Sequence, residues 1–403
     1  MESDRHDFDL LNELPHIYEL EDMMKFCKQH KSLYIYGRGW NQEHLLKYFD
    51  ECNISIDGFV VTQKDESCDN NFVYRKIPVI EFSEMIKMKD VGVILGLSDK
   101  YYNEIIPMFR KFGFDDYFMM TEYSKRAIAG QMRKRSKEVL GFEVSMADHC
   151  NLSCQMCDHF SQLSEENYVG VDVFEKDMVQ MAKLYDHECG PITLLGGEPT
   201  LNRDLPRCIE ITRREFPKAV IGIMSNGILL SDDSNAFCKK IWESCSKNNV
   251  RIEITVYPIS INYNNIEKLA KKYDVDLIMS SNIHAEELTK VTKISDKHTL
   301  DLNKKVDDFY FINCLYFNKF NVLKNGRIYM CPIEAHIDIF NRRFNKDLTY
   351  QDGDSLDIYE LNSWEEIREW TSHRIPFCSY CDLKKWGHHS EWKSSTKQIE
   401  EYI

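Results

Sequence analysis

Three cysteines lie within eight positions of the segment DHCNLSCQMCDHF, at Cys150, Cys154 and Cys157. A structural zinc site usually takes four protein ligands with cysteines paired as C-x₂-C, and an ordinary [4Fe–4S] site also takes four cysteines. The C-x₃-C-x₂-C spacing supplies only three thiols. His149 and His159 could complete a zinc site, whereas three thiolates on a cubane would leave one iron open to a small molecule.

Two further groups of polar and glycine residues follow predicted strands downstream in the sequence. The first is GGEPT, with Gly196, Gly197, Glu198 and Pro199, and the second is SNG, with Ser225, Asn226 and Gly227. Glycines allow backbone carbonyls to approach a ligand, and a glutamate can offset an ammonium charge. All three motifs are expected at strand ends.

In this order, the three motifs resemble those of the radical S-adenosylmethionine superfamily, over about residues 140–285. The resemblance implies a [4Fe–4S] cluster on the three cysteines, whose open iron chelates the amino and carboxylate groups of S-adenosylmethionine. It implies that the GGEP turn binds the methionyl amino group and that Ser225 and Asn226 approach the ribose. Met156 stands where family members usually carry an aromatic residue against the adenine. The reduced cluster would then yield a 5′-deoxyadenosyl radical that removes hydrogen from an unactivated C–H bond.

Four more cysteines occupy the last quarter of the chain: Cys314, Cys331, Cys378 and Cys381. With Gly326 they form C-x₁₁-G-x₄-C followed by C-x₂-C, which resembles the auxiliary-cluster domains called SPASM and twitch. The single-cluster twitch form fits better and implies a second, auxiliary [4Fe–4S] cluster that exchanges an electron or holds the fold. A zinc ribbon would use the same four ligands.

The bulk composition limits the partners. The chain has 403 residues, 43% hydrophobic residues and a net charge of −14. This balance argues against nucleic acid as a partner, and no run of about 18 apolar residues indicates a membrane span. The acidic N-terminus lacks a signal-peptide pattern, so a cytoplasmic location is predicted. Seven single cysteines are then expected as small buried hydrophobic residues: Cys27, Cys52, Cys68, Cys189, Cys208, Cys238 and Cys245.

The element pattern predicts an α/β protein with four parts. Residues 1–122 alternate short strands and helices, as in a Rossmann-like parallel sheet, and 123–139 form a basic, solvated linker helix. Residues 140–305 contain five strand–helix units and predict a partial (β/α)₆ TIM-like barrel, with an open sheet as the alternative. Residues 306–403 are expected as a small twitch-like domain with a β-hairpin at Asn325-Gly326.

The N-terminal part contains YGRGWNQ, with Gly37 and Gly39 but Gln42 in place of a third glycine. Asp50 and Asp57 are poor matches for a ribose-binding acid, so NAD binding is not expected. The pattern is similar to the N-terminal domain of bacterial sugar-modifying acetyltransferases, which holds a nucleotide-sugar. A docking or oligomerisation domain without ligand is the alternative.

These resemblances imply an enzyme that abstracts hydrogen from a sugar or polyol, nucleotide-linked, with dehydration, dehydrogenation or epimerisation as the outcome. Flavodoxin or ferredoxin would supply electrons. His159 and Tyr257 are candidate acid–base residues, as are His388 and His389, although each is also a common structural type. The alternatives are a peptide maturase, which usually carries a winged-helix domain, and a non-catalytic binding module with a vestigial cluster.

Overall fold

The computed structural model describes residues 17–38, 40–64, 76–98, 101–279, 294–303, 314, 316–318, 321–385 and 387–403. The chain divides into two compact units, and each is described here by itself. The first comprises residues 1–134 and 307–315, and the second comprises 135–306 and 316–403.

The first unit is built on a five-stranded parallel sheet with strand order β3-β2-β1-β4-β5. Its strands are β1 (Ser32–Tyr36), β2 (Gly58–Val61), β3 (Val79–Glu81), β4 (Val91–Leu95) and β5 (Tyr117–Met119). Every residue of β4 is buried, as expected for a strand covered on both faces. The predicted alternation of strands and helices is confirmed, and this strand order is that of the first five strands of a doubly wound fold.

The helices of the first unit are α2 (Ile17–Lys28), α3 (Trp40–Glu51), α4 (Phe82–Met85), α5 (Tyr102–Lys111) and α6 (Glu122–Met132). Aromatic packing joins α4 and α5 to the sheet, because the rings of Phe82 and Phe109 stack at 4.9 Å and Tyr36 meets Phe109 edge-on at 5.3 Å. Gln42 and Asp57, two of the residues that gave a poor match to a dinucleotide-binding pattern, both bond within the protein. Gln42 donates to the Gly96 carbonyl at 2.9 Å, and Asp57 accepts from the backbone of β1. Gly39 lies outside the described residues.

Helix α6 corrects the prediction of a solvated basic helix over 123–139. It ends at Met132, and it packs against α3. Lys125 is only 2% exposed and donates to the Leu97 carbonyl at 2.6 Å. The reason is that Ile128, Ala129 and Met132 form an apolar stripe at helical spacing, whereas most of the basic residues follow the helix.

The second unit contains an eight-stranded sheet with order β10-β9-β8-β7-β6-β12-β13-β14. Its strands are β6 (Phe142–Ser145), β7 (Ile192–Leu195), β8 (Ile221–Ser225), β9 (Val250–Ile254), β10 (Leu277–Met279), β12 (Val322–Lys324), β13 (Arg327–Tyr329) and β14 (Ser355–Asp357). The five strands β6 to β10 are parallel in chain order, and β12 is a sixth parallel strand beside β6. β13 and β14 continue the sheet antiparallel.

The predicted hairpin is confirmed, with Asn325 and Gly326 both at positive φ in the turn between β12 and β13. It extends the main sheet, so residues 316–403 belong to the same compact unit as residues 135–306 and do not form a separate domain. A buried aspartate on α7 holds this turn, because Asp177 accepts from the Gly326 amide at 2.8 Å and from the Tyr359 hydroxyl at 2.6 Å.

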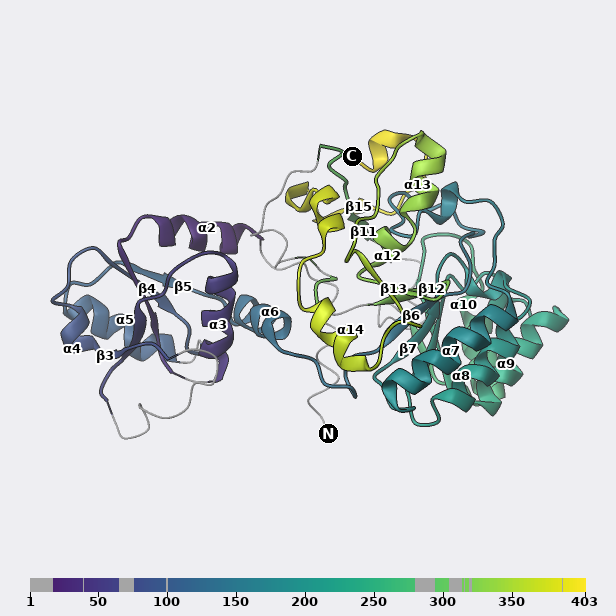
Figure 1. Ribbon diagram of the computed structural model, residues 1–403, viewed down its shortest axis with the longest axis horizontal. Coiled ribbons are helices and arrows are strands. Elements are labelled where there is room, and N and C mark those ends of the chain that lie inside the picture. Colours follow the sequence, from purple (N-terminus) through teal and green to yellow (C-terminus); the bar gives the residue numbers. More distant parts are fainter. Residues whose placement is uncertain are drawn as a thin grey trace. The chain divides into compact units, whose positions relative to one another are not determined.

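Four long helices cover one face of the parallel strands: α7 (Val171–Tyr185), α8 (Leu205–Glu215), α9 (Ala236–Lys247) and α10 (Tyr263–Tyr273) (Figure 1). Their apolar sides and the outward-facing strand residues share one hydrophobic core, in which Trp242 and Phe216 are fully buried. Arg213 at the end of α8 donates to the carbonyls of five loop residues: Phe216, Pro217, Ala219, Asn248 and Asn249.

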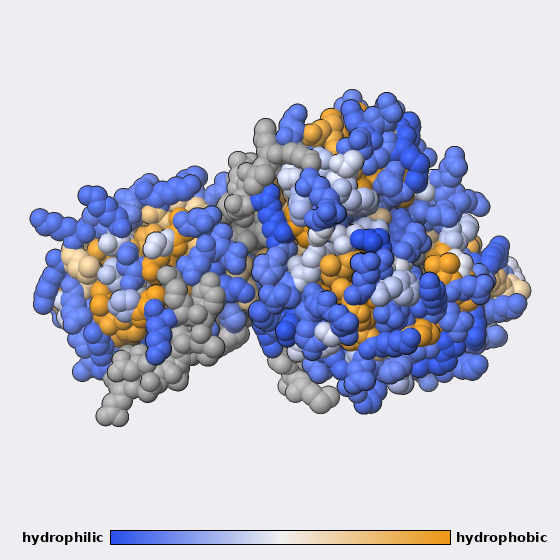
Figure 2. All heavy atoms as spheres, in the orientation of Figure 1, coloured by the Kyte–Doolittle hydropathy of each residue, from blue (hydrophilic) through white to orange (hydrophobic). Residues whose placement is uncertain are grey.

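The remaining elements of the second unit are short. They are η4 (Ser161–Leu163), η5 (Pro199–Leu201), η6 (Leu229–Ser231), α12 (Pro332–Ala335), α13 (Ile337–Phe344), α14 (Trp364–Thr371), η8 (Pro376–Tyr380), η9 (Leu383–Lys385), η10 (Ile399–Glu401) and the antiparallel pair β11 (Ile294–Lys297) and β15 (Gly387–Glu391). Hydrophilic side chains cover most of the visible face of each unit (Figure 2). Among the described residues, no helix has the length and apolar character needed to cross a membrane.

The single cysteines behave largely as predicted. Cys27, Cys208, Cys238 and Cys245 are buried, whereas Cys52 and Cys189 are half-buried and Cys68 lies outside the described residues. Burial raises the pKa of the Cys27, Cys52 and Cys208 thiols to about 12. These thiols are therefore protonated near neutral pH.

Candidate functional site

The three motifs predicted at strand ends meet around one cavity of about 330 Å³ in the second unit. Its described lining includes residues at or after the carboxyl ends of β6, β7 and β8: Cys150, Cys154, Met156, Cys157, Gly196, Gly197, Glu198, Ser225 and Asn226. Because β6, β7 and β8 are adjacent and parallel, their carboxyl ends lie at the same edge of the sheet. The topology therefore explains how residues about 75 positions apart in the sequence come to line one space.

The two glycines after β7 allow that turn to approach the cysteine loop. A Cβ added at Gly196 would lie 2.6 Å from the Ala147 carbonyl oxygen, and one added at Gly197 would lie 2.0 Å from the His149 oxygen. Gly196 also has φ of 120°, which favours glycine. The Gly197 amide donates to Ala147 at 2.6 Å and the Glu198 amide to His149 at 2.9 Å. The close approach is thus between two protein segments.

Glu198 is 1% exposed and joins the ends of β7 and β8. Its carboxylate accepts from the Thr200 amide and hydroxyl, from the Ser225 hydroxyl at 2.8 Å and from the Asn226 amide at 2.9 Å. Burial raises the pKa of Glu198, and these hydrogen bonds oppose the rise. Pro199 begins η5 and is buried beside Glu198, but it does not line the cavity.

Asn226 connects the end of β8 to the cysteine loop. Its side-chain amide donates to the Asn151 oxygen at 2.8 Å and lies 3.7 Å from the Cys150 sulfur. Its oxygen accepts from the Ile228 amide, so every polar atom of this side chain is used. The SNG motif therefore positions the loop that carries the thiols.

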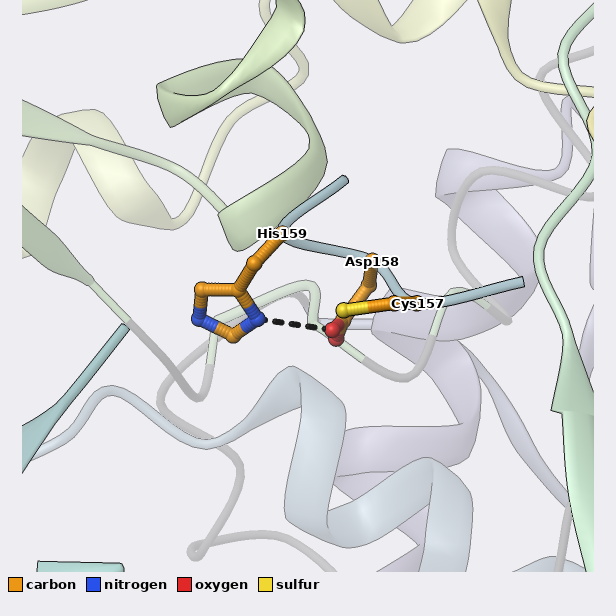
Figure 3. Close-up of side chains that lie close together, drawn as sticks. All are labelled: Cys157, Asp158 and His159. Atoms are coloured by element: carbon orange, nitrogen blue, oxygen red, sulfur yellow. Dashed lines mark hydrogen bonds and ion pairs between the residues drawn. The ribbon is translucent and has the colours of Figure 1, made fainter. Parts of the chain in front are cut away.

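His159, predicted as a candidate acid–base residue, lines the cavity and contacts Asp158 at 2.8 Å (Figure 3). The second oxygen of Asp158 accepts from the Tyr316 hydroxyl at 2.6 Å. Burial alone lowers the pKa of His159, but the Asp158 carboxylate raises it well above its usual range. Although burial raises the pKa of Asp158, His159 holds it well below its usual range. The two side chains form a buried ion pair.

Tyr257, the other predicted candidate, also lines the cavity, and its hydroxyl interacts with Cys154. Burial and the neighbouring thiol raise its pKa well above the usual range. Its ring meets that of Trp392 edge-on at 5.8 Å. Tyr257 therefore contacts the cysteine loop directly.

The chain's C-terminal segment supports the cysteine loop, which the sequence did not indicate. Gln155 donates from its backbone to the Lys393 carbonyl at 3.0 Å, and Ser395 donates to Ser153 at 2.9 Å. These bonds form a short antiparallel bridge between residues 154 and 394. No sequence motif marks this pairing, because it involves backbone groups about 240 positions apart.

Glu143 also lines the cavity and was missed by the sequence interpretation. Burial, together with Asp158, raises the pKa of its carboxyl from 4.5 to about 7, and His159 opposes this rise. A signal was present in the FEVS text of β6, where polar residues alternate with Phe142 and Val144, two members of the helix-side core.

The cavity lining shows which cysteines could share a metal group. Cys150, Cys154 and Cys157 all line it. Cys157, Asp158 and His159 also each bring one ligand atom to within 4.8 Å of the others. His149 bonds the Ser164 carbonyl and does not line the cavity. Three thiols facing one space, with no fourth in its described lining, fit the predicted cluster.

Three of the C-terminal cysteines lie in or beside short helical elements. Cys331 caps α12, and Cys378 and Cys381 occupy one turn at η8, where the Cys381 amide donates to the Cys378 carbonyl at 3.1 Å. Cys314 belongs to the 307–315 segment of the first unit. The auxiliary cluster therefore stays a prediction.

His388 and His389 lie in β15, whose backbone pairs with Asp296 and Ser295 of β11. Their side chains fall outside the described part of the structure. Their candidate role stays untested.

Comparisons with known proteins give distant structural similarities. No protein-family model matches the sequence, and no curated protein matches it. The fold is similar to BtrN in complex with AdoMet and 2-DOIA, at 16% identity and a TM-score of 0.38, covering 67% of this chain and 98% of BtrN. It is also similar to Streptococcus suis SuiB bound to S-adenosylmethionine, at 14% identity and 0.31, covering 69% and 78%. Native anSMEcpe with bound AdoMet aligns at 19% identity and 0.28, over 34% and 42%.

Proposed function

We propose that this protein is a radical S-adenosylmethionine enzyme that acts on a small sugar or polyol. The observation that carries the proposal is the convergence of three motifs on one cavity: the three thiols, the Gly196-Gly197-Glu198 turn and the Ser225-Asn226 pair. When bound there, a [4Fe–4S] cluster with S-adenosylmethionine would supply the radical chemistry that removes a hydrogen atom from the substrate.

The chain's own residues have distinct roles in this proposal. Cys150, Cys154 and Cys157 hold the cluster. Burial and the nearby Glu198 raise the pKa of the Cys150 thiol, and a bound cluster would stabilise its thiolate form. Asn226 orients the cysteine loop through Asn151 and Cys150.

The surroundings of the loop are proposed to limit the access of water. Tyr257 and Trp392 cover the side of the cavity near Cys154, and residues 393–395 pair with the loop backbone. Met156, at φ of 60°, lines the same space and is proposed to contact the adenine through its thioether. Glu198 lines the cavity beside Cys150, and its carboxylate is proposed to stabilise the methionyl ammonium group there.

The reaction proposed is dehydration, dehydrogenation or epimerisation at one carbon. The His159–Asp158 pair is the best-placed proton donor, since it is the only histidine–carboxylate pair among the described lining residues at hydrogen-bond distance. We further propose that Cys314, Cys331, Cys378 and Cys381 hold an auxiliary [4Fe–4S] cluster, and that a flavodoxin or ferredoxin donates electrons. The N-terminal unit is proposed to hold a nucleotide attached to the substrate.

Anaerobic reconstitution tests the proposal. Wild type should contain about eight irons, as two [4Fe–4S] clusters require, and should release 5′-deoxyadenosine from S-adenosylmethionine with dithionite. The Cys150/Cys154/Cys157→Ala variant should retain about four irons and release none. Cys189→Ser, which alters a cysteine outside the cavity, should match wild type. Release of no 5′-deoxyadenosine by an iron-loaded wild type would refute the enzyme proposal and favour a binding module.

A further inference from the structure

The cavity has polar atoms that the protein itself does not satisfy. Glu143 Oε2, Ser161 Oγ and Trp392 Nε1 are buried, line the cavity and have no hydrogen-bond partner among the described residues. Ser161 is 1% exposed. The three atoms are a carboxylate acceptor, a hydroxyl and an N–H donor, so together they offer both kinds of hydrogen bond.

Glu143 faces the cavity because of the strand period. Phe142 and Val144 enter the core under the helices, so Glu143 and Ser145 project from the opposite face of β6. Ser145 is engaged, since its hydroxyl meets His336 at 3.0 Å. Glu143 shares no such partner in the described structure.

The charged neighbours of Glu143 are committed elsewhere. Asp158 pairs with His159 and accepts a hydrogen bond from the Tyr316 hydroxyl. Glu198, the third lining carboxylate, accepts hydrogen bonds from the Thr200 amide, the Ser225 hydroxyl and the Asn226 amide. Burial consequently raises the pKa of Glu143 to about 7. A carboxylate buried without a partner destabilises the fold, so its presence points to a ligand group that pairs with it.

The sign of charge in the cavity restricts that ligand. The described lining includes three carboxylates, from Glu143, Asp158 and Glu198, and it includes no lysine or arginine. The His159 side chain is cationic but is paired with Asp158, so it leaves no free positive charge for an anion. Phosphate and diphosphate groups are bound in proteins by cations and by clusters of N–H donors. This cavity is therefore unsuited to an anionic group and suited to a hydroxyl or an ammonium.

We infer that Glu143, Ser161 and Trp392 form a substrate subsite that binds a neutral or cationic polyol, with Glu143 accepting from a hydroxyl or ammonium group of that substrate. The inference rests on the proposed function and narrows its substrate. A nucleotide or phosphate attached to the substrate has to lie outside this cavity.

Binding of three probes to the anaerobic, cluster-loaded protein with S-adenosylmethionine tests the inference. The probes are glucose, glucosamine and glucose 6-phosphate, followed by ligand-observed NMR titration. Wild type should bind glucose and glucosamine at least about tenfold more tightly than glucose 6-phosphate. Glu143→Gln should weaken glucosamine binding about tenfold or more, because a charged hydrogen bond is lost, and Ser161→Ala should weaken binding of both neutral and cationic probes severalfold.

The matched control is Glu165→Gln, which makes the same change at an exposed position and should leave all three affinities unchanged. A stronger effect of Glu143→Gln on glucosamine than on glucose identifies an ammonium as the recognised group, and equal effects identify a hydroxyl. The inference is overturned if glucose 6-phosphate binds wild type as tightly as glucose, if Glu143→Gln changes nothing, or if no probe binds.

Iron content, the cluster EPR signal and 5′-deoxyadenosine release on the same wild-type preparation separate the two claims. Their absence means that the proposed function fails. If they are present, but the probe affinities do not depend on the charge of the probe or on Glu143, only the subsite inference is wrong.

Discussion

Replacing Gly197 by alanine should disrupt the cysteine loop more than any other single-methyl change near the cavity. The added Cβ would lie 2.0 Å from the His149 carbonyl oxygen and 2.5 Å from its carbonyl carbon, whereas ordinary contact begins at 3.4 Å. Both obstructing atoms belong to the backbone, so no side-chain rotation relieves the overlap. The segment before Cys150 must move by about 1.4 Å to restore ordinary contact.

The magnitude follows from the contacts that this movement breaks. The Gly197 amide donates to Ala147 at 2.6 Å and the Glu198 amide to His149 at 2.9 Å, and each bond contributes about 1 kcal/mol. Residual overpacking adds about 1–3 kcal/mol. The free energy of unfolding should therefore fall by about 3–5 kcal/mol, which lowers the melting temperature of a unit of this size by roughly 6–20 °C.

Anaerobic thermal unfolding and iron content measure the effect. Gly197→Ala should melt lower and lose the iron that depends on Cys150. The control is Gly170→Ala, where nothing lies within 4 Å of the added Cβ and φ is −75°, and it should cost under about 1 kcal/mol. Gly197→Ala with wild-type iron and a melting temperature within about 2 °C of wild type would refute the steric argument.

Three further predictions concern stability. The pKa of Glu143 is about 7 in the folded protein and about 4.5 in the unfolded chain. The stability that its protonated carboxyl contributes to the fold is therefore fully present below pH 4.5 and is lost as the pH rises through 7. Urea titration of the apoprotein should show this as a difference between Glu143→Gln and wild type. The free energy of unfolding of the variant, relative to that of wild type, should rise by about 2–3 kcal/mol between pH 5 and pH 8. A difference that does not change with pH would contradict the prediction. Asp177→Ala should cost about 3 kcal/mol by urea unfolding, against under about 1 kcal/mol for exposed Asp172→Ala. Arg213→Lys should lower the melting temperature by roughly 4–8 °C, because lysine cannot reach five carbonyls, and Arg207→Lys should leave it unchanged.

Local sequence patterns were sufficient where the signal is local. The strand and helix order over about residues 32–61, 91–111 and 140–279 followed from short apolar runs and amphipathic periods, and the Asn325-Gly326 turn from its preference for positive φ. Helix α6 was misjudged because charge was counted without the apolar stripe of Ile128, Ala129 and Met132. Its burial depends on α3, which is 71 residues earlier at its closest.

Non-local pairing was not predictable in this way. Strand β12 pairs with β6. This pairing could not be predicted, because the residues of a strand do not specify which neighbouring strand it will pair with. The bridge between residues 154 and 394 uses only backbone groups, so it leaves no mark on residue type. Glu143 was overlooked because a glutamate in a strand is ordinary when that face meets water.

The sequence by itself determined which groups are available for chemistry: three thiols at C-x₃-C-x₂-C, the Gly-Gly-Glu-Pro turn and the polar Ser225-Asn226 pair. These are properties of residue type and spacing. Only the tertiary structure decided that the three motifs share one cavity, that its described lining is acidic, and that Glu143 and Ser161 face it without partners. Those features depend on which groups remain unpaired once every element has packed, and that is a property of the whole fold.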